Sequence, residues 1–236
     1  MRDRDHHARE DRRVIAYRGP SAIDGAPILA VVTGANGRPS ANAKTGPLAQ
    51  LWILPADRPV WDAIRAGHDR SVCGDCPRRP SIAGYGRAGC YVARRAWREV
   101  AQVQRRATGP ADLAGTCAAL RAAWRGIRLG AYGDPGALPP GIVPQLVEGA
   151  KGWTGYTRRW QTRPDLRPYC HASVEHELAA WHAWVAGWRT FRVLQPSDAS
   201  LPTLERACPA ASGRTTCDRC RACKGSSGRS VTIREH

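Results

Sequence analysis

The chain has 236 residues, of which 42% are hydrophobic and 24% are charged. This composition is typical of a globular protein and excludes a collagen-like or wholly disordered chain. Lys and Arg together number 36 against 20 Asp and Glu, which gives a net charge of +16. A field of this sign attracts polyanions, so we expect a nucleic acid or nucleotide partner, with a solubilising surface as the alternative.

The sequence contains no run of the ~20 consecutive apolar residues that a membrane-spanning helix needs, so no membrane partner is expected. Residues 1–13 alternate charged side chains and lack the apolar segment of a secretory signal. We therefore expect a cytoplasmic protein. Residues 1–20 are predicted to be a disordered, charged tail that ends in a Gly-Pro turn.

After this tail, short apolar runs bounded by turn residues alternate with amphipathic segments. Strands are expected at 27–32, 48–54, 126–132, 153–156, 169–174, 188–194 and 230–234. Helices are expected at 92–106, 111–124, 142–152 and 175–186, with a shorter one near 201–207. This alternation predicts an α/β fold with a largely parallel sheet over residues 21–200, followed by a Cys-rich segment over 201–236.

Two sets of side chains are assigned to the core. Leu178, Trp181 and Val185 are spaced i, i+3, i+7, which predicts the buried stripe of a helix. Cys117 and Cys170 lie within apolar segments, and we interpret them as core thiols.

The other cysteines form two clusters, and in a reducing compartment clustered cysteines are more often metal ligands than disulfides. The first cluster is Cys73-Gly-Asp-Cys76, followed by Cys90. Three thiolates can leave one position of a metal centre open, and an open iron could bind a substrate or cofactor directly. The alternative is a zinc site that a distant ligand completes.

The second cluster has four cysteines in the order C-x8-C-x2-C-x2-C: Cys208, Cys217, Cys220 and Cys223. Four thiolates would close either a tetrahedral zinc site or a fully ligated iron-sulfur cluster. The consecutive C-x2-C spacing favours iron, because three cysteines at that spacing can wrap one cubane.

The order of these features resembles the radical S-adenosylmethionine (SAM) superfamily. The resemblance covers roughly residues 47–195: a strand, the three-Cys loop ending in Cys90-Tyr91, a helix, a strand ending in Gly133-Asp134-Pro135, and a later strand ending in Ser173-Val174-Glu175. The Cys loop here is C-x2-C-x13-C where the family has C-x3-C-x2-C, and Asp134 stands where the family has Glu. Cys-rich proteins of bacteriophages with a similar Gly-Asp turn are the nearest group.

The resemblance implies a partial (β/α) barrel with mostly parallel strands. It implies that Cys73, Cys76 and Cys90 hold a 4Fe-4S cluster, and that the C-terminal cysteines form an auxiliary iron-sulfur site. Gly133 and Asp134 would then meet the amino group of SAM, and Ser173 with Glu175 its ribose. Such an enzyme cleaves SAM reductively with an electron from a donor such as a flavodoxin or ferredoxin, and abstracts a hydrogen from its substrate, here a nucleotide or a nucleic-acid-related molecule.

Arg158 and Arg159 follow a strand at the same face, and they are candidates to hold a phosphate or simply part of a solvated loop. The sequence identifies no catalytic residue. The alternative to an enzyme is a zinc-stabilised, Arg-rich protein that binds nucleic acid without catalysis.

Overall fold

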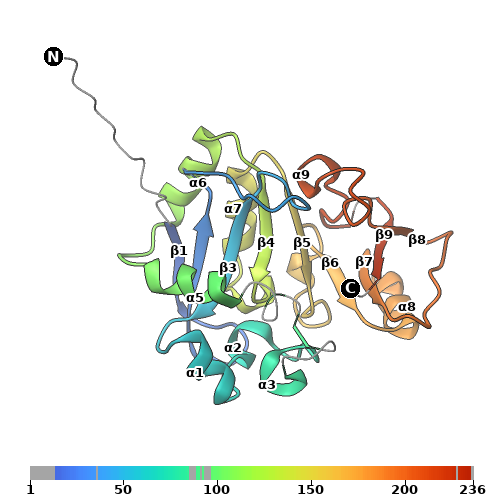
Figure 1. Ribbon diagram of the computed structural model, residues 1–236, viewed down its shortest axis with the longest axis horizontal. Coiled ribbons are helices and arrows are strands. Elements are labelled where there is room, and N and C mark those ends of the chain that lie inside the picture. Colours follow the sequence, from blue (N-terminus) through green and yellow to red (C-terminus); the bar gives the residue numbers. More distant parts are fainter. Residues whose placement is uncertain are drawn as a thin grey trace.

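The computed structural model describes residues 14–35, 37–84, 89, 90, 92, 97–226 and 228–234. They form a mixed α/β fold around one open sheet of nine strands in the order β1-β2-β3-β4-β5-β6-β7-β9-β8 (Figure 1). Within this part of the chain, none of the helices combines the length and apolar character that crossing a membrane requires.

Seven of the nine strands, all except β1 and β8, lie close to their predicted positions. The nine strands are β1 (Val14–Pro20), β2 (Pro27–Thr33), β3 (Ala49–Pro55), β4 (Ile127–Tyr132), β5 (Trp153–Thr157), β6 (His171–Val174), β7 (Thr190–Leu194), β8 (Glu205–Ala207) and β9 (Ser230–Arg234). β1, β2 and β3 pair antiparallel, and every later pairing is parallel. The expected largely parallel sheet is therefore confirmed.

Two predictions near the chain ends are wrong. The expected tail over residues 1–20 extends too far, because Val14–Pro20 forms β1 and buries Ile15 and Ala16 against β2. Residues 1–13 of that tail lie outside the described residues. The helix expected near 201–207 is replaced by β8, which pairs with β9, so the C-terminal segment is built into the sheet.

The helices fill the connections between strands. They are α1 (Val60–Arg65), α2 (Arg70–Cys73), α3 (Pro80–Ala83), α5 (Trp97–Arg106), α6 (Leu113–Ala122), α7 (Ile142–Gly149), α8 (Glu177–Val185) and α9 (Cys217–Cys220), with short 3-10 turns η1 (Pro135–Ala137) and η2 (Pro164–Leu166). Part of the helix expected at 92–106 falls on residues that the structure does not describe. The connection after β3 is the longest and carries the first cysteine cluster.

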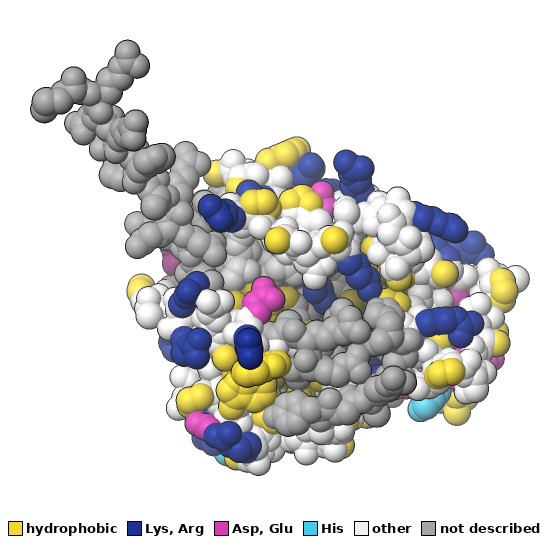
Figure 2. Space-filling view, viewed as in Figure 1, with side chains coloured by type: hydrophobic (Ala, Val, Ile, Leu, Met, Phe, Trp, Pro, Cys, Tyr) yellow, Lys and Arg dark blue, Asp and Glu magenta, His cyan; other side chains and the backbone are white. Residues whose placement is uncertain are grey.

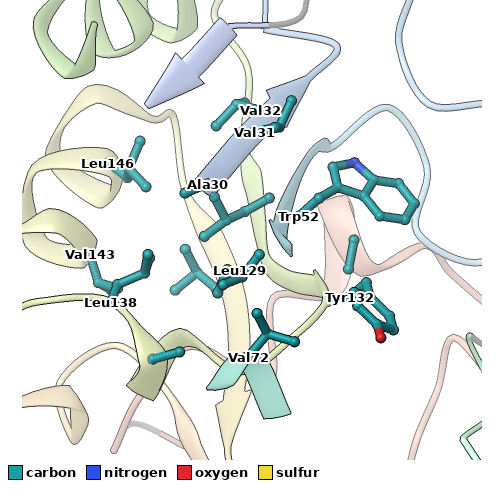
Figure 3. Packing of buried hydrophobic residues seen from close by; sticks show 14 of the residues in the cluster. Ala30, Val31, Val32, Trp52, Val72, Leu129, Tyr132, Leu138, Val143 and Leu146 are labelled. Atoms are coloured by element: carbon teal, nitrogen blue, oxygen red, sulfur yellow. The ribbon is translucent and has the colours of Figure 1, made fainter. Parts of the chain in front are cut away.

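Alternation along the strands separates a helix-covered face of the sheet from an opposite face. Leu129 of β4 packs into the core on the side of Val143 and Leu146 from α7, whereas Trp52 and Tyr132 lie on the other side (Figure 3). α7 contacts β4, and α8 contacts β6 and β7. Because successive side chains of a strand point to opposite faces, the neighbours of these core residues line the face away from α7 and α8.

The expected buried stripe of α8 is wrong. Leu178, Trp181 and Val185 are 68%, 46% and 87% exposed, and the buried residues of the helix are Ala180 and Ala183. The small alanines let the helix approach β6 and β7 closely, and this turns the large apolar side chains outward.

Candidate functional site: a cysteine-lined cavity

A cavity of about 340 Å³ lies over the face of the sheet away from α7 and α8. Alternate residues of the parallel strands form its wall, including Arg128 of β4, Thr154 and Tyr156 of β5, Ser173 of β6 and Phe191 of β7. The cavity is also lined by all of the cysteines predicted as ligands: Cys73, Cys76, Cys90, Cys208, Cys217, Cys220 and Cys223. Two sets of cysteines from distant parts of the sequence therefore face one space.

The first set lies where the connection after β3 passes the carboxyl end of β4. Cys73 ends α2, and the backbone amide of Asp134 donates to the carbonyl of Val72 (2.7 Å), which ties α2 to the end of β4. Burial raises the pKa of the Cys73 thiol well above its ordinary value, and the nearby Cys90 and Cys76 raise it further. The three cysteines of the predicted loop are thus neighbours in space.

The second set is held near the opposite end of the strands. The amide of Cys208 donates to the carbonyl of Thr232 in β9 (2.8 Å), and the amide of Cys217 donates to the carbonyl of Lys44 (2.9 Å). Thr216 is the N-cap of α9, and its hydroxyl accepts from the amide of Arg219.

The members of the second set also lie near one another. Burial raises the pKa of the Cys223 thiol, and Cys208, Cys217 and Cys220 raise it further. Positive charge offsets part of this effect at Cys217, where burial raises the pKa and the neighbouring Arg128 and Lys44 lower it.

The cysteines of each set lie near one another but do not form a closed site for a single metal ion. Within the residues that the structure describes, no three His, Cys, Asp or Glu side chains form a group that could hold one metal ion. Cys117 and Cys170, expected as core thiols, are both buried, and Cys117 donates to the carbonyl of Gln145 (3.3 Å). The remaining seven cysteines are the ones that face the cavity.

Gly133 and Asp134, predicted to meet the amino group of SAM, form the turn after β4 and line the cavity. Gly133 has φ +77°, and a side chain there would meet the carbonyl oxygen of Ile53 at 2.6 Å. The Asp134 carboxylate accepts from the Gly136 amide (2.7 Å), the Thr157 hydroxyl (2.6 Å) and the Arg158 amide (2.6 Å).

Burial raises the pKa of Asp134, and these three hydrogen bonds lower it in part. The carboxylate therefore joins the turn after β4 to the end of β5. This clamp is a role that the sequence did not indicate, and the expected contact of Asp134 with a cofactor stays a prediction.

Ser173 lines the cavity, whereas Glu175, its expected partner at a ribose, forms ion pairs with two arginines that line it. Its carboxylate accepts from Arg78 (3.0 Å to Nη2) and from Arg158. Burial raises the pKa of Glu175, but the hydrogen bonds and charges of both arginines outweigh it and leave the pKa below its ordinary value. Because Arg78 follows Cys76 closely, this triad fixes the cysteine loop to the ends of β5 and β6.

The expected phosphate-binding pair is engaged within the protein. Arg158 pairs with Glu175, and Arg159 pairs with Asp75 (3.2 Å). Lys and Arg side chains are spread over the face in Figure 2 among uncharged and hydrophobic ones, with no single basic patch among the residues described there.

Sequence reasoning missed the residues that give the cavity wall its chemistry. The rings of Tyr156 and Phe191 stack with centroids 4.5 Å apart and planes 12° apart, and Arg128 donates from Nη2 to the Tyr156 hydroxyl (3.1 Å). In the sequence, these residues are marked only by alternation within the predicted strands. That alternation does not show which face of the sheet borders the cavity. Comparison with known proteins finds no family model, no curated protein and no solved structure that matches this chain.

Proposed function

We propose that this protein is an iron-sulfur enzyme in which Cys73, Cys76 and Cys90 hold a 4Fe-4S cluster with one open iron position. The second set, Cys208, Cys217, Cys220 and Cys223, would hold a second, fully ligated cluster. The observation that carries the proposal is the cavity that both sets line. A substrate in that cavity would lie between the two cysteine sets, one at each end.

The consecutive C-x2-C spacing of Cys217, Cys220 and Cys223 in the sequence favours an iron-sulfur cluster over zinc, because three cysteines at that spacing can wrap one cubane. Thiolates bind both, but sulfurs around one tetrahedral zinc ion lie roughly 4 Å apart, since each Zn–S bond is about 2.3 Å. The described side chains do not close around a single ion, although members of each set interact electrostatically.

The cofactor proposed beside the first cluster is SAM. The monotonic order of β3 to β7 supports a partial (β/α) barrel, in which ligands bind at the carboxyl ends of the strands. An open cluster with SAM supplies reductive cleavage of SAM and hydrogen abstraction by a radical. The chain's own part is positioning: Asp134 fixes the turn after β4, and Glu175 with Arg78 fixes the cysteine loop.

The test is metal analysis of the full chain purified without oxygen after growth with iron and cysteine. We expect about four irons with matching sulfide per cluster, and absorbance near ~400 nm. Cys73→Ala should remove one cluster and Cys220→Ala the other, whereas Cys117→Ala, a buried thiol outside the cavity, should leave the iron content unchanged. Colourless protein with stoichiometric zinc and no iron would contradict the proposal.

That contrary result would favour the second candidate, a zinc-stabilised protein that binds nucleic acid without catalysis. The net charge of +16 supports this candidate. In either case, burial raises the pKa of Cys73 and Cys223, so metal uptake must displace protons and should weaken as the pH falls.

A further inference from the structure

The middle of the cavity wall carries an aromatic surface that neither cysteine set requires. Tyr156 of β5 and Phe191 of β7 stack across the intervening strand β6. The β6 residue in register with Phe191 is Ser173, which also lines the cavity. Because this side chain is small, the two rings can meet above it, and both aromatic residues line the cavity.

Positive charge lies beside this surface. The guanidinium of Arg128 is hydrogen-bonded to the hydroxyl of Tyr156 (3.1 Å), and Lys44 reaches the cavity from the loop before β3. Arg128 and Lys44 both neighbour Cys217, so their charges lie in one region of the wall. Among the described lining residues the acidic one is Asp134, and its carboxylate accepts three hydrogen bonds.

An aromatic surface with cations at its edge matches a ligand that joins a planar ring to an anionic group. Bases stack on aromatic side chains regardless of their identity, and Arg binds phosphate oxygens through several N–H donors. A cavity of about 340 Å³ is at the small end of ligand sites and excludes a double helix.

We propose that this cavity binds a nucleotide, with its base against the Tyr156–Phe191 pair and its phosphate held by Arg128 and Lys44. The inference deepens the proposed function, on which it rests for the chemistry, by assigning the residues that recognise the substrate. The nucleotide can be free or an unpaired residue of a single strand, since both offer the same ring and phosphate.

The experiment measures the affinity of the full chain for AMP and for adenosine, with iron content determined on the same sample. We expect AMP to bind at least about tenfold more tightly than adenosine, because only AMP offers a phosphate to a charged hydrogen-bond donor. Arg128→Gln should weaken this preference, since Lys44 alone would then hold the phosphate, and Arg128→Lys should keep more of it. The control is Arg65→Gln, which changes an exposed arginine outside the cavity.

The aromatic half of the site is tested in the same assay. Tyr156→Leu should weaken AMP and adenosine equally, by about 5-fold to 100-fold, whereas Tyr156→Phe should retain the ring contact. A single-stranded oligoadenylate is compared with AMP at equal nucleotide concentration. If the oligoadenylate competes more strongly, the natural ligand is an unpaired residue of a single strand. Weaker competition would identify the free nucleotide.

Equal affinity for AMP and adenosine, or variants that leave the ratio unchanged, would overturn the nucleotide site. So would an Arg128→Gln protein that loses metal but keeps the AMP preference, since Arg128 would then serve only the charge of the cysteines. Iron-loaded protein without AMP preference contradicts this inference alone. AMP preference in protein without iron contradicts the proposed function alone.

Discussion

The backbone amide of Gly155, in β5, donates a hydrogen bond to the carbonyl oxygen of Cys223 (2.8 Å). β5 pairs with β6 at Tyr156–His171 and Thr157–Ala172. Gly155 precedes these pairs, and its amide is bonded to the C-terminal segment instead of to β6. The second cysteine set is therefore anchored in the sheet. Whatever that set binds is linked to the stability of the strands.

From this link we predict that metal removal destabilises the C-terminal segment. Chelation of the loaded protein should lower its Tm and open residues 208–226 to proteolysis, because a metal joined to Cys208 and the cysteines of α9 contributes folding free energy. The measurement is a thermal melt with limited proteolysis, before and after chelation. An identical Tm and cleavage pattern in both states would refute the prediction.

The ion pair between Arg192 and Glu205 should be strongly sensitive to the loss of one partner. The two side chains are 2% and 0% exposed and form hydrogen bonds of 2.8 and 2.6 Å. Glu205→Gln leaves a buried guanidinium without its counter-charge, which should cost about 3–5 kcal/mol in the free energy of unfolding. As a matched control, Asp62→Asn disrupts the exposed pair with Arg65 and should cost less than about 1 kcal/mol in urea unfolding.

The Asp134 carboxylate, with its three hydrogen bonds, should contribute more to the free energy of unfolding than the Thr157 hydroxyl alone. Asp134→Ala leaves the Gly136 and Arg158 amides and the Thr157 hydroxyl without their acceptor, at about 1–3 kcal/mol for each donor that stays buried. We expect a loss of at least about 3 kcal/mol in urea unfolding. Thr157→Val keeps the carboxylate and both amide bonds to it, and should cost about 1–2 kcal/mol. Equal losses would argue against the clamp.

Burial of His171 predicts a defined pH dependence of stability. Its side chain is buried, and desolvation lowers its pKa from 6.5 to about 4. The unfolded chain binds this proton more readily, so the stabilising contribution is complete above about pH 6.5 and is lost as the pH falls towards 4. The loss should approach about 3 kcal/mol.

Denaturant unfolding between pH 4 and 7 tests this dependence. His171→Leu should flatten the curve, and His182→Gln, on the exposed side of α8, should leave it unchanged. A curve of the same slope in wild type and His171→Leu would show that other groups cause the dependence.

Because the large apolar side chains of α8 are exposed and its alanines are buried, substitutions at the alanines should destabilise the protein more than substitutions at the large residues. Val185→Ser changes a side chain that is 87% exposed, so the free energy of unfolding should change by no more than about 0.5 kcal/mol. Ala183→Leu adds volume at a fully buried position against the sheet and should cost about 1–3 kcal/mol. The reverse order in thermal or urea unfolding would restore the interpretation of the large residues as core.

The sequence by itself determined the strands of the parallel sheet, because an apolar run bounded by turn residues can be buried in few other ways. It also determined which cysteines are grouped, since the C-x2-C spacing is local. It failed where packing overrides local pattern. Residues 14–20 become a strand only because β2 offers an edge to pair with, and residues 205–207 only because β9 does.

Only the tertiary structure decided that Cys90 and Cys208, far apart in the chain, face the same cavity. The same holds for the Asp134 clamp, for Glu175 between two arginines, and for Tyr156 stacked on Phe191. Each of these contacts joins separate elements, and their approach depends on how the whole sheet packs and twists. A local pattern gives the face and spacing of a residue, but it cannot give the neighbour that faces it.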